Sequence, residues 1–174
     1  MKKRILSAVA LLCMVVCLSG CSSNQGADVD SIEWVTEDYE DYFTFQVPLE
    51  WSGEHGMYSA DEDSSVPGSF YINNTLSYIL NPNSFSPLED FVESETTNLD
   101  SNETLVEQER ISIGGRRGYR YVIERIGELD NEEYSYQSEY YAFEAKDTVF
   151  SLWFGVFTDN NVRKYIVDSI QINN

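Results

Sequence analysis

The sequence predicts an α+β fold in which an antiparallel β-sheet meander carries helices packed on it. Three observations lead to this prediction: four strand-like segments follow one another between residues 104 and 157, a capped helix pattern precedes them, and an amphipathic pattern follows them. Strands that are consecutive in the chain and joined by tight turns pair as antiparallel hairpins. We therefore expect one sheet with a helix before and a helix after the meander.

Three short strands are predicted ahead of the first helix, at residues 42–47, 57–60 and 69–80. The first, YFTFQV, alternates aromatic or β-branched side chains with polar ones, which indicates a strand. Pro48 ends it, because proline has no N–H to donate to a strand ladder. An acidic loop at residues 61–65 separates the second strand from the third.

The first helix has the clearest start signal in the chain. Ser86 at the N-cap, Pro87 at the first helical position and Glu89 at the third predict a capping box, in which a hydroxyl and a carboxylate satisfy free backbone N–H groups. Apolar side chains then recur at helical spacing, which predicts one buried stripe. The stripe consists of Leu88, Phe91, Val92 and Leu99.

The meander is predicted from four strands at residues 104–113, 118–128, 134–145 and 148–157. The turns between them contain small residues or residues that tolerate a left-handed backbone, as hairpins require. These turns are Gly114-Gly115, Asp130-Asn131 and Lys146-Asp147. After the last strand, Thr158-Asp159 can cap a final amphipathic helix that includes Val162 and Ile166.

This order of elements resembles the PsbP-like family, which is named after an extrinsic protein of photosystem II. The resemblance covers residues 39–172, and its matching residues are Phe45, Val47, Pro48 and Trp51 near the start and Ser169-Ile170 near the end. It implies an α/β/α sandwich, and members of this fold serve mostly as binding or assembly modules. No functional residue of the family has a matching motif in this chain, so none is transferred.

The N-terminus resembles the signal peptide of a bacterial lipoprotein. Three basic residues at positions 2–4 precede an apolar stretch at residues 5–18, and Leu18-Ser19-Gly20-Cys21 matches the lipobox at which such proteins are lipidated and cleaved. The alternative is an uncleaved membrane anchor. The apolar stretch is shorter than the ~20 residues that span a bilayer, which favours the signal peptide.

This interpretation divides the chain and places it in the cell. We predict a signal peptide at residues 1–20, a flexible tether at 21–36 and one PsbP-like domain at 37–174. A lipid on Cys21 would hold the protein at the extracytoplasmic face of the cell membrane. Because Cys13 and Cys17 lie in the signal peptide and Cys21 carries the lipid, no cysteine remains for a disulfide or a metal site.

The predicted exported part is strongly acidic. The whole chain has a net charge of −19, and the signal peptide holds three of its eleven basic residues and none of its thirty acidic ones, so cleavage makes the charge −22. A polyanion of this size is repelled by phosphate backbones, which argues against nucleic acid as a partner. Solubility is the simplest reason for the charge.

The residue inventory argues against an enzyme. His55 is the only histidine, it lies in a stretch predicted to be an exposed turn, and no Gly-x-Ser-x-Gly motif accompanies it. A catalytic zinc site usually takes two or three histidine or cysteine ligands, which this chain does not offer. We predict no catalytic residue, no metal and no cofactor.

The acidic loop contains a candidate cation site. Asp61 and Asp63 provide the hard oxygen ligands that Ca²⁺ prefers. The twelfth position counted from Asp61 is Ile72 instead of the bidentate glutamate of a calcium loop. The spacing therefore favours the alternative interpretation, a solvated turn.

A basic cluster is a candidate for partner binding. Arg116 and Arg117, with Arg110, Arg120 and Arg125 nearby, could dock a carboxylate or a phosphate through their guanidinium groups. Alternatively these two are solvated turn residues, and the neighbouring arginines pair across the strands with Glu107, Glu109 or Glu124.

Five tyrosines form a second candidate. They alternate along the second and third strands of the meander and so can share one face of the sheet: Tyr119, Tyr121, Tyr134, Tyr136 and Tyr140. A helix over that face would make them core, whereas an open face would make them a platform for glycan or peptide stacking.

Together these observations predict a non-catalytic, lipid-anchored extracytoplasmic binding or assembly module of the bacterial cell envelope. Its partner is an unknown envelope protein or ligand, besides the membrane that holds the lipid on Cys21. Two alternatives stay open. One is a lipoprotein that binds a small ligand or a cation, and the other is an envelope hydrolase that uses paired carboxylates.

Overall fold

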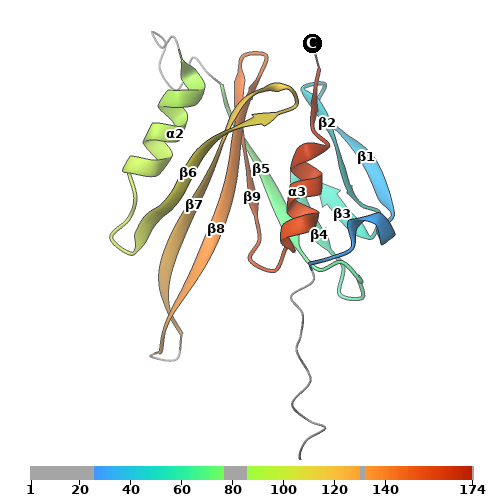
Figure 1. The fold of residues 1–174 in the computed structure, drawn as a ribbon, viewed down its shortest axis with the longest axis horizontal. Coiled ribbons are helices and arrows are strands. Elements are labelled where there is room, and N and C mark those ends of the chain that lie inside the picture. The colour runs from blue at the N-terminus through green and yellow to red at the C-terminus, as the bar shows by residue number, and fades with distance from the viewer. Residues whose placement is uncertain (1–25, 77–85, 130–131, 174) are drawn as a thin grey trace, which may run out of the picture.

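The computed structural model describes residues 26–76, 86–129 and 132–173, and its strands form two antiparallel sheets (Figure 1). A large sheet has the strand order β3-β4-β5-β9-β8-β7-β6, and a small sheet has the order β1-β2-β10. The strands are β1 (Trp34–Tyr39), β2 (Phe43–Pro48), β3 (Trp51–Glu54), β4 (Met57–Ala60), β5 (Ser69–Leu76), β6 (Glu103–Ile113), β7 (Arg116–Leu129), β8 (Glu132–Ala145), β9 (Thr148–Phe154) and β10 (Gln171–Ile172).

The predicted α+β fold and its meander are confirmed. Strands β6 to β9 are consecutive neighbours in the large sheet, and β5 joins the meander by pairing with β9. Gly114 and Gly115 at the β6–β7 turn have φ of 57° and 76°, and the exposed His55 and the buried Gly56 at the β3–β4 turn have 51° and 80°. A two-residue hairpin turn of type I′ needs this left-handed backbone at both positions. The predicted turn Asp130-Asn131 lies outside the described residues.

Strand β9 is shorter than predicted, and β5 is described over only part of its predicted length. β9 ends at Phe154 instead of residue 157, because the Gly155 N–H donates to the Ser69 carbonyl and the Thr158 N–H donates to the Gly155 carbonyl. These bonds turn the chain toward α3 (Asn160–Asp168). β5 is described as far as Leu76, and the remainder of the strand predicted at 69–80 lies outside the described residues.

The folded part begins earlier than the predicted tether at residues 21–36 allows. β1 pairs with β2 from Trp34 onward, and a 3-10 turn, η1 (Val29–Ser31), precedes it. The Trp34 ring stacks on Tyr165 with the ring centroids 4.0 Å apart, and its indole N–H donates to the Val29 carbonyl. The tether prediction was wrong for residues 29–36. Their acidic composition offers little apolar surface, but the large side chain of Trp34 packs on the domain and orders the segment.

Helix α2 (Pro87–Thr97) begins where predicted, but no capping box forms. The Ser86 side chain makes no cap hydrogen bond, and the Glu89 carboxylate lies 2.8 Å from Arg117 and 3.3 Å from the Tyr119 hydroxyl on β7. A guanidinium is a stronger partner for a carboxylate than a backbone N–H is, so Glu89 ties the helix to the sheet. The predicted stripe faces the sheet: Leu88 and Val92 are buried, Phe91 and Leu99 are half-buried, and Thr96 of the same helix is buried as well.

Helix α3 follows the predicted cap. The Asp159 carboxylate accepts a hydrogen bond from the Asn161 N–H at 2.8 Å, and Val162 and Ile166 are fully buried. No helix in the described part of the chain is long and apolar enough to cross a membrane.

The main core lies on the inner face of the large sheet, which we define as the face toward α3 and the small sheet (Figure 1). Alternate residues of β5, β8 and β9 line this face, and β2 packs against them. Phe43 of β2 is fully buried, with its ring centroid 5.1 Å from those of Phe143 and Phe150. The outer face is the opposite one, which carries α2.

Replacing Phe43 should test the contact between the two sheets. Phe43→Ala removes a fully buried ring, and we expect the free energy of unfolding to fall by about 3–5 kcal/mol in urea titrations. Phe157 is 82% exposed and provides a matched control, so Phe157→Ala should change stability by less than about 0.5 kcal/mol. Equal losses for the two variants would contradict this view of the core.

Candidate functional site

The outer face of the large sheet collects the five tyrosines. Tyr119 and Tyr121 on β7 alternate with inner-face residues, as do Tyr134, Tyr136 and Tyr140 on β8. The register is Tyr119 opposite Ala142, Tyr121 opposite Tyr140, Arg125 opposite Tyr136 and Gly127 opposite Tyr134. Because side chains that are directly opposite share a face, all five project to the same side of the sheet.

An aromatic row crosses four strands of this face. It consists of Tyr71 on β5, Trp153 on β9, Tyr140 on β8 and Tyr121 on β7, each directly opposite the next. The rings of Tyr71 and Trp153 stack with their centroids 4.9 Å apart, and those of Tyr140 and Tyr121 stack at 5.0 Å. We call these four residues the aromatic row.

Helix α2 covers one end of the aromatic row and leaves the rest partly open. Tyr121 and its neighbour Tyr119 are buried beneath the helix. The other three members of the row are half-buried, as is Tyr136, and Tyr134 is 48% exposed. Each of the two interpretations of the tyrosines therefore describes one part of the face, a core beneath α2 and an aromatic surface beyond it.

Sequence reasoning missed Tyr71 and Trp153. Strand alternation alone separates them from the inner-face residues Phe70 and Phe154, and that signal was present in the sequence. The sequence pattern does not reveal that β5 pairs with β9, and this pairing brings together segments far apart in the chain. Only that pairing extends the tyrosine face into a row.

An arginine lies beside the aromatic row. Nε of Arg125 is 2.6 Å from Oε1 of Glu103, and its guanidinium carbon is 5.7 Å from the centroid of the Tyr140 ring. A hydrogen bond from the Asp100 N–H lowers the pKa of Glu103, so this carboxylate stays charged. Burial raises the pKa of the Tyr140 hydroxyl and that of Tyr121. Both phenols are therefore neutral at physiological pH.

Trp153 keeps one polar atom unsatisfied. Its indole N–H is buried and has no hydrogen-bond partner among the described residues. A buried donor without a partner costs about 1–3 kcal/mol. Such an atom calls for an explanation, and a bound water or ligand group is one.

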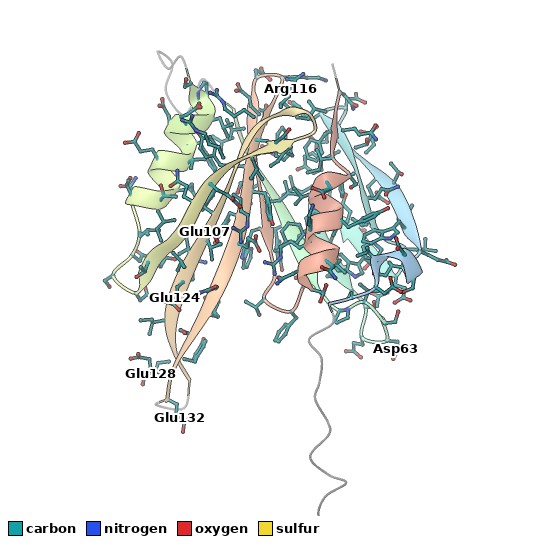
Figure 2. All side chains as sticks on the ribbon, in the orientation of Figure 1. Asp63, Glu107, Arg116, Glu124, Glu128 and Glu132 are labelled. Atoms are coloured by element: carbon teal, nitrogen blue, oxygen red, sulfur yellow. The ribbon has the colours of Figure 1, made fainter. Side chains whose placement is uncertain are left out.

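The structure does not bring the basic cluster together. Three of its arginines form ion pairs on different faces of the sheet: Arg117 with Glu89, Arg120 with Glu107 and Glu109, and Arg125 with Glu103. The pairing of Arg120 is the one that the alternative interpretation of this cluster describes. Arg116 lies at the exposed β6–β7 turn (Figure 2). The guanidinium groups thus do not converge on one anion site.

The acidic loop is held in place by a neighbouring carboxylate. Glu50 accepts hydrogen bonds from the Ser64 hydroxyl at 2.9 Å and the Ser65 N–H at 2.6 Å, and these bonds lower the pKa of Glu50. Asp61 accepts from the Ser52 hydroxyl at 3.3 Å, and Asp63 is exposed (Figure 2). In residues 26–76, 86–129 and 132–173, no three metal-ligating side chains lie together.

Comparison with known proteins bears on the fold. No protein-family model matches the sequence, and no curated protein matches it. The solution structure of cyanobacterial PsbP (CyanoP) from Synechocystis sp. PCC 6803 aligns with 84% of this chain and 96% of its own, with a TM-score of 0.50 and 10% identity. The fold is PsbP-like. At this identity the similarity concerns the fold alone.

Two further solved structures are similar to this chain. A protein from Bacteroides thetaiotaomicron VPI-5482 shares 14% identity over 76% of this chain, with a TM-score of 0.46, and the chain spans 46% of that protein. LpqN of Mycobacterium tuberculosis, described as involved in cell envelope biogenesis, shares 12% identity over 83% of this chain and 92% of its own, with a TM-score of 0.45. At these scores neither structure carries an argument about function.

Within the PsbP-like fold, a buried carboxylate ties α3 to the large sheet. Glu139 of β8 is 8% exposed, and its two oxygens bind Arg120 of β7 and Arg163 of α3. The Tyr141 hydroxyl also donates to it at 2.7 Å. Burial and the charge of Arg120 lower the pKa of Arg163. Because protein donors occupy both oxygens of Glu139, we interpret it as a structural link.

Removing this carboxylate should reveal its structural role. Glu139→Leu leaves Arg163 buried without its counterion, and we expect a loss of about 3 kcal/mol in the free energy of unfolding. The double variant Glu139→Leu/Arg163→Met should recover most of that loss, because it removes both charges. Unchanged stability in the single variant would contradict the assignment. Chemical denaturation of the three proteins provides the measurement.

Proposed function

We propose that this protein is a lipid-anchored, extracytoplasmic, non-catalytic binding or assembly module of the bacterial cell envelope. The observation that carries the proposal is the aromatic row, which begins beneath α2 and continues onto a partly open sheet surface. Stacked aromatic rings combine a large apolar area with hydroxyl and indole groups, which is the composition of protein interaction surfaces. The unsatisfied Trp153 N–H on the same face supports this interpretation.

The lipid anchor is supported by the lipobox at residues 18–21. Further along the chain, the Ala27 carbonyl accepts a hydrogen bond from the Asn161 side chain at 3.0 Å, which fixes Ala27 beside the first turn of α3. Cys21 precedes Gly26 by five positions, which span at most about 18 Å of extended chain. A lipid on Cys21 would therefore hold the domain close to the bilayer.

The assignment as a non-catalytic module is supported by how the candidate groups are used. The only histidine, His55, occupies an exposed turn, and the carboxylates of Glu139 and Glu103 are bound to arginines. These two carboxylates have structural partners in the fold. We therefore propose that the protein acts by binding and carries out no reaction.

Fatty-acid labelling tests the anchor. In the native bacterium, the wild-type chain should incorporate an alkyne fatty-acid analogue and fractionate with membranes, and Cys21→Ala should lose the label and keep its signal peptide. Gel mobility and click labelling report both properties. Cys13→Ala provides the matched control and should behave like wild type. An unlabelled wild-type chain would refute the anchor.

Site-specific photocrosslinking tests the binding surface. A benzoylphenylalanine in place of Tyr136, beside the aromatic row, should give one discrete adduct in living cells, whereas the same residue in place of the exposed Leu49 between β2 and β3 should not. Adding Trp153→Leu should reduce the adduct at least about tenfold, because it removes the central ring of the row. Equal adducts at both positions, or an adduct that is insensitive to Trp153→Leu, would refute the proposal.

A further inference from the structure

The β7–β8 hairpin projects beyond the rest of the large sheet and leaves a free strand edge (Figure 1). β8 begins at Glu132, but β9 pairs only with residues 139–145. Residues 132–138 therefore pair with β7 on one side and with no described strand on the other. The edge is accessible, because five of its first six residues are exposed and Tyr136 is half-buried. We call residues 132–138 the free edge.

β9 stops short because its backbone turns away. The last pair of the ladder joins Phe154 to Glu139, after which the Gly155 N–H bonds to Ser69 on the side of β5. The next two residues, Val156 and Phe157, are 47% and 82% exposed. An exposed apolar loop thus begins at the point where a strand lying along the free edge would start.

The two faces of the projecting hairpin differ in chemistry. Tyr134 and Tyr136 lie on the outer face, with their ring centroids 5.9 Å apart. The inner face carries Glu128 directly across from Glu133, and Glu124, which pairs with Gln137, lies further along the same face (Figure 2). Like charges directly opposite each other destabilise a strand pair. A cation placed between these carboxylates would relieve that repulsion.

We propose that the free edge binds an extended, basic segment of a partner protein, which adds as a strand beside β8. Backbone hydrogen bonds to the free edge would hold the segment. Its lysine or arginine side chains would face Glu128 and Glu133, and its alternate apolar side chains would face Tyr134 and Tyr136. Val156 and Phe157 would contact its end.

Charge selects this partner over the other candidates for the edge. A second copy of the chain would bring its own Glu132 and Glu133 against the same residues, at a net charge of −19 per chain. Charged residues at strand edges prevent self-association in this way. They exclude an acidic or identical strand and attract a basic one. This inference deepens the proposed function by naming the partner's chemistry and its mode of docking.

Peptide binding to the full chain in zwitterionic nanodiscs tests the proposal. The probe is a fluorescein-labelled peptide of alternating lysine and valine, followed by anisotropy. We expect it to bind, and we expect the same peptide N-methylated at alternate residues to lose binding, because that change removes backbone donors and keeps the charge. Equal binding of the two peptides would overturn strand addition.

Charge-matched variants separate docking from general attraction. Glu128→Gln/Glu133→Gln should weaken binding about tenfold, whereas Glu62→Gln/Asp63→Asn on the distant β4–β5 loop should change it less than about twofold (Figure 2). Equal weakening by both pairs would overturn the proposal. Hydrogen exchange on the wild-type chain needs no variant, and bound peptide should protect alternate amides of the free edge. Unchanged exchange there would also overturn the proposal.

The two proposals can fail separately. If the peptide does not bind while the Tyr136 adduct still depends on Trp153, strand docking is wrong and the binding function stands. If the peptide binds at the free edge but the protein carries no fatty acid, the anchor is wrong and docking stands.

Discussion

Both faces of the large sheet are apolar, and the chain covers them unequally. The inner face is sealed by β2 and α3, whose Phe43, Phe45, Val162 and Ile166 are at most 1% exposed. Among the described residues, the outer face receives only α2, which is too short to cover a row of aromatic rings that crosses four strands. An antiparallel sheet tolerates one solvated face, so the structure stays folded with part of that surface open. The candidate binding surface is a consequence of this unequal cover.

The charges of the domain are also distributed unequally between its interior and its surface. Four of the eight basic residues described in the domain have internal roles: Arg117 fixes α2, Arg125 lies beside the aromatic row, and Arg120 and Arg163 hold Glu139 between the sheet and α3. The surplus carboxylates remain at the surface, including those of the projecting hairpin. A surface of this kind favours a basic partner and disfavours phosphate polymers and a second copy of itself.

The unequal lengths of β8 and β9 give the molecule its second exposed feature. A strand can be longer than its neighbour only if part of its edge stays unpaired, and such an edge is either blunted or used. Here Glu132 and Glu133 disfavour pairing with the same strand of a second copy, and the edge remains open to a strand of opposite charge. The aromatic surface and the free edge meet at Tyr134 and Tyr136, so one extended partner could occupy both.

Local patterns in the sequence determined much of the fold. Alternation predicted the meander strands and placed the five tyrosines on one face, and Pro87 and Asp159 marked the helix starts, because these signals depend only on residues near each other in the chain. Trp34 inside an acidic segment, the pairing of β5 with β9, and the binding of Glu89 to Arg117 instead of its own helix end were decided by the tertiary structure. Each depends on a partner distant in the chain, and no local pattern encodes which distant groups will meet. For the same reason, the sequence supplied the aromatic side chains of the candidate site, whereas only the packed fold decided which of them α2 buries and which stay open.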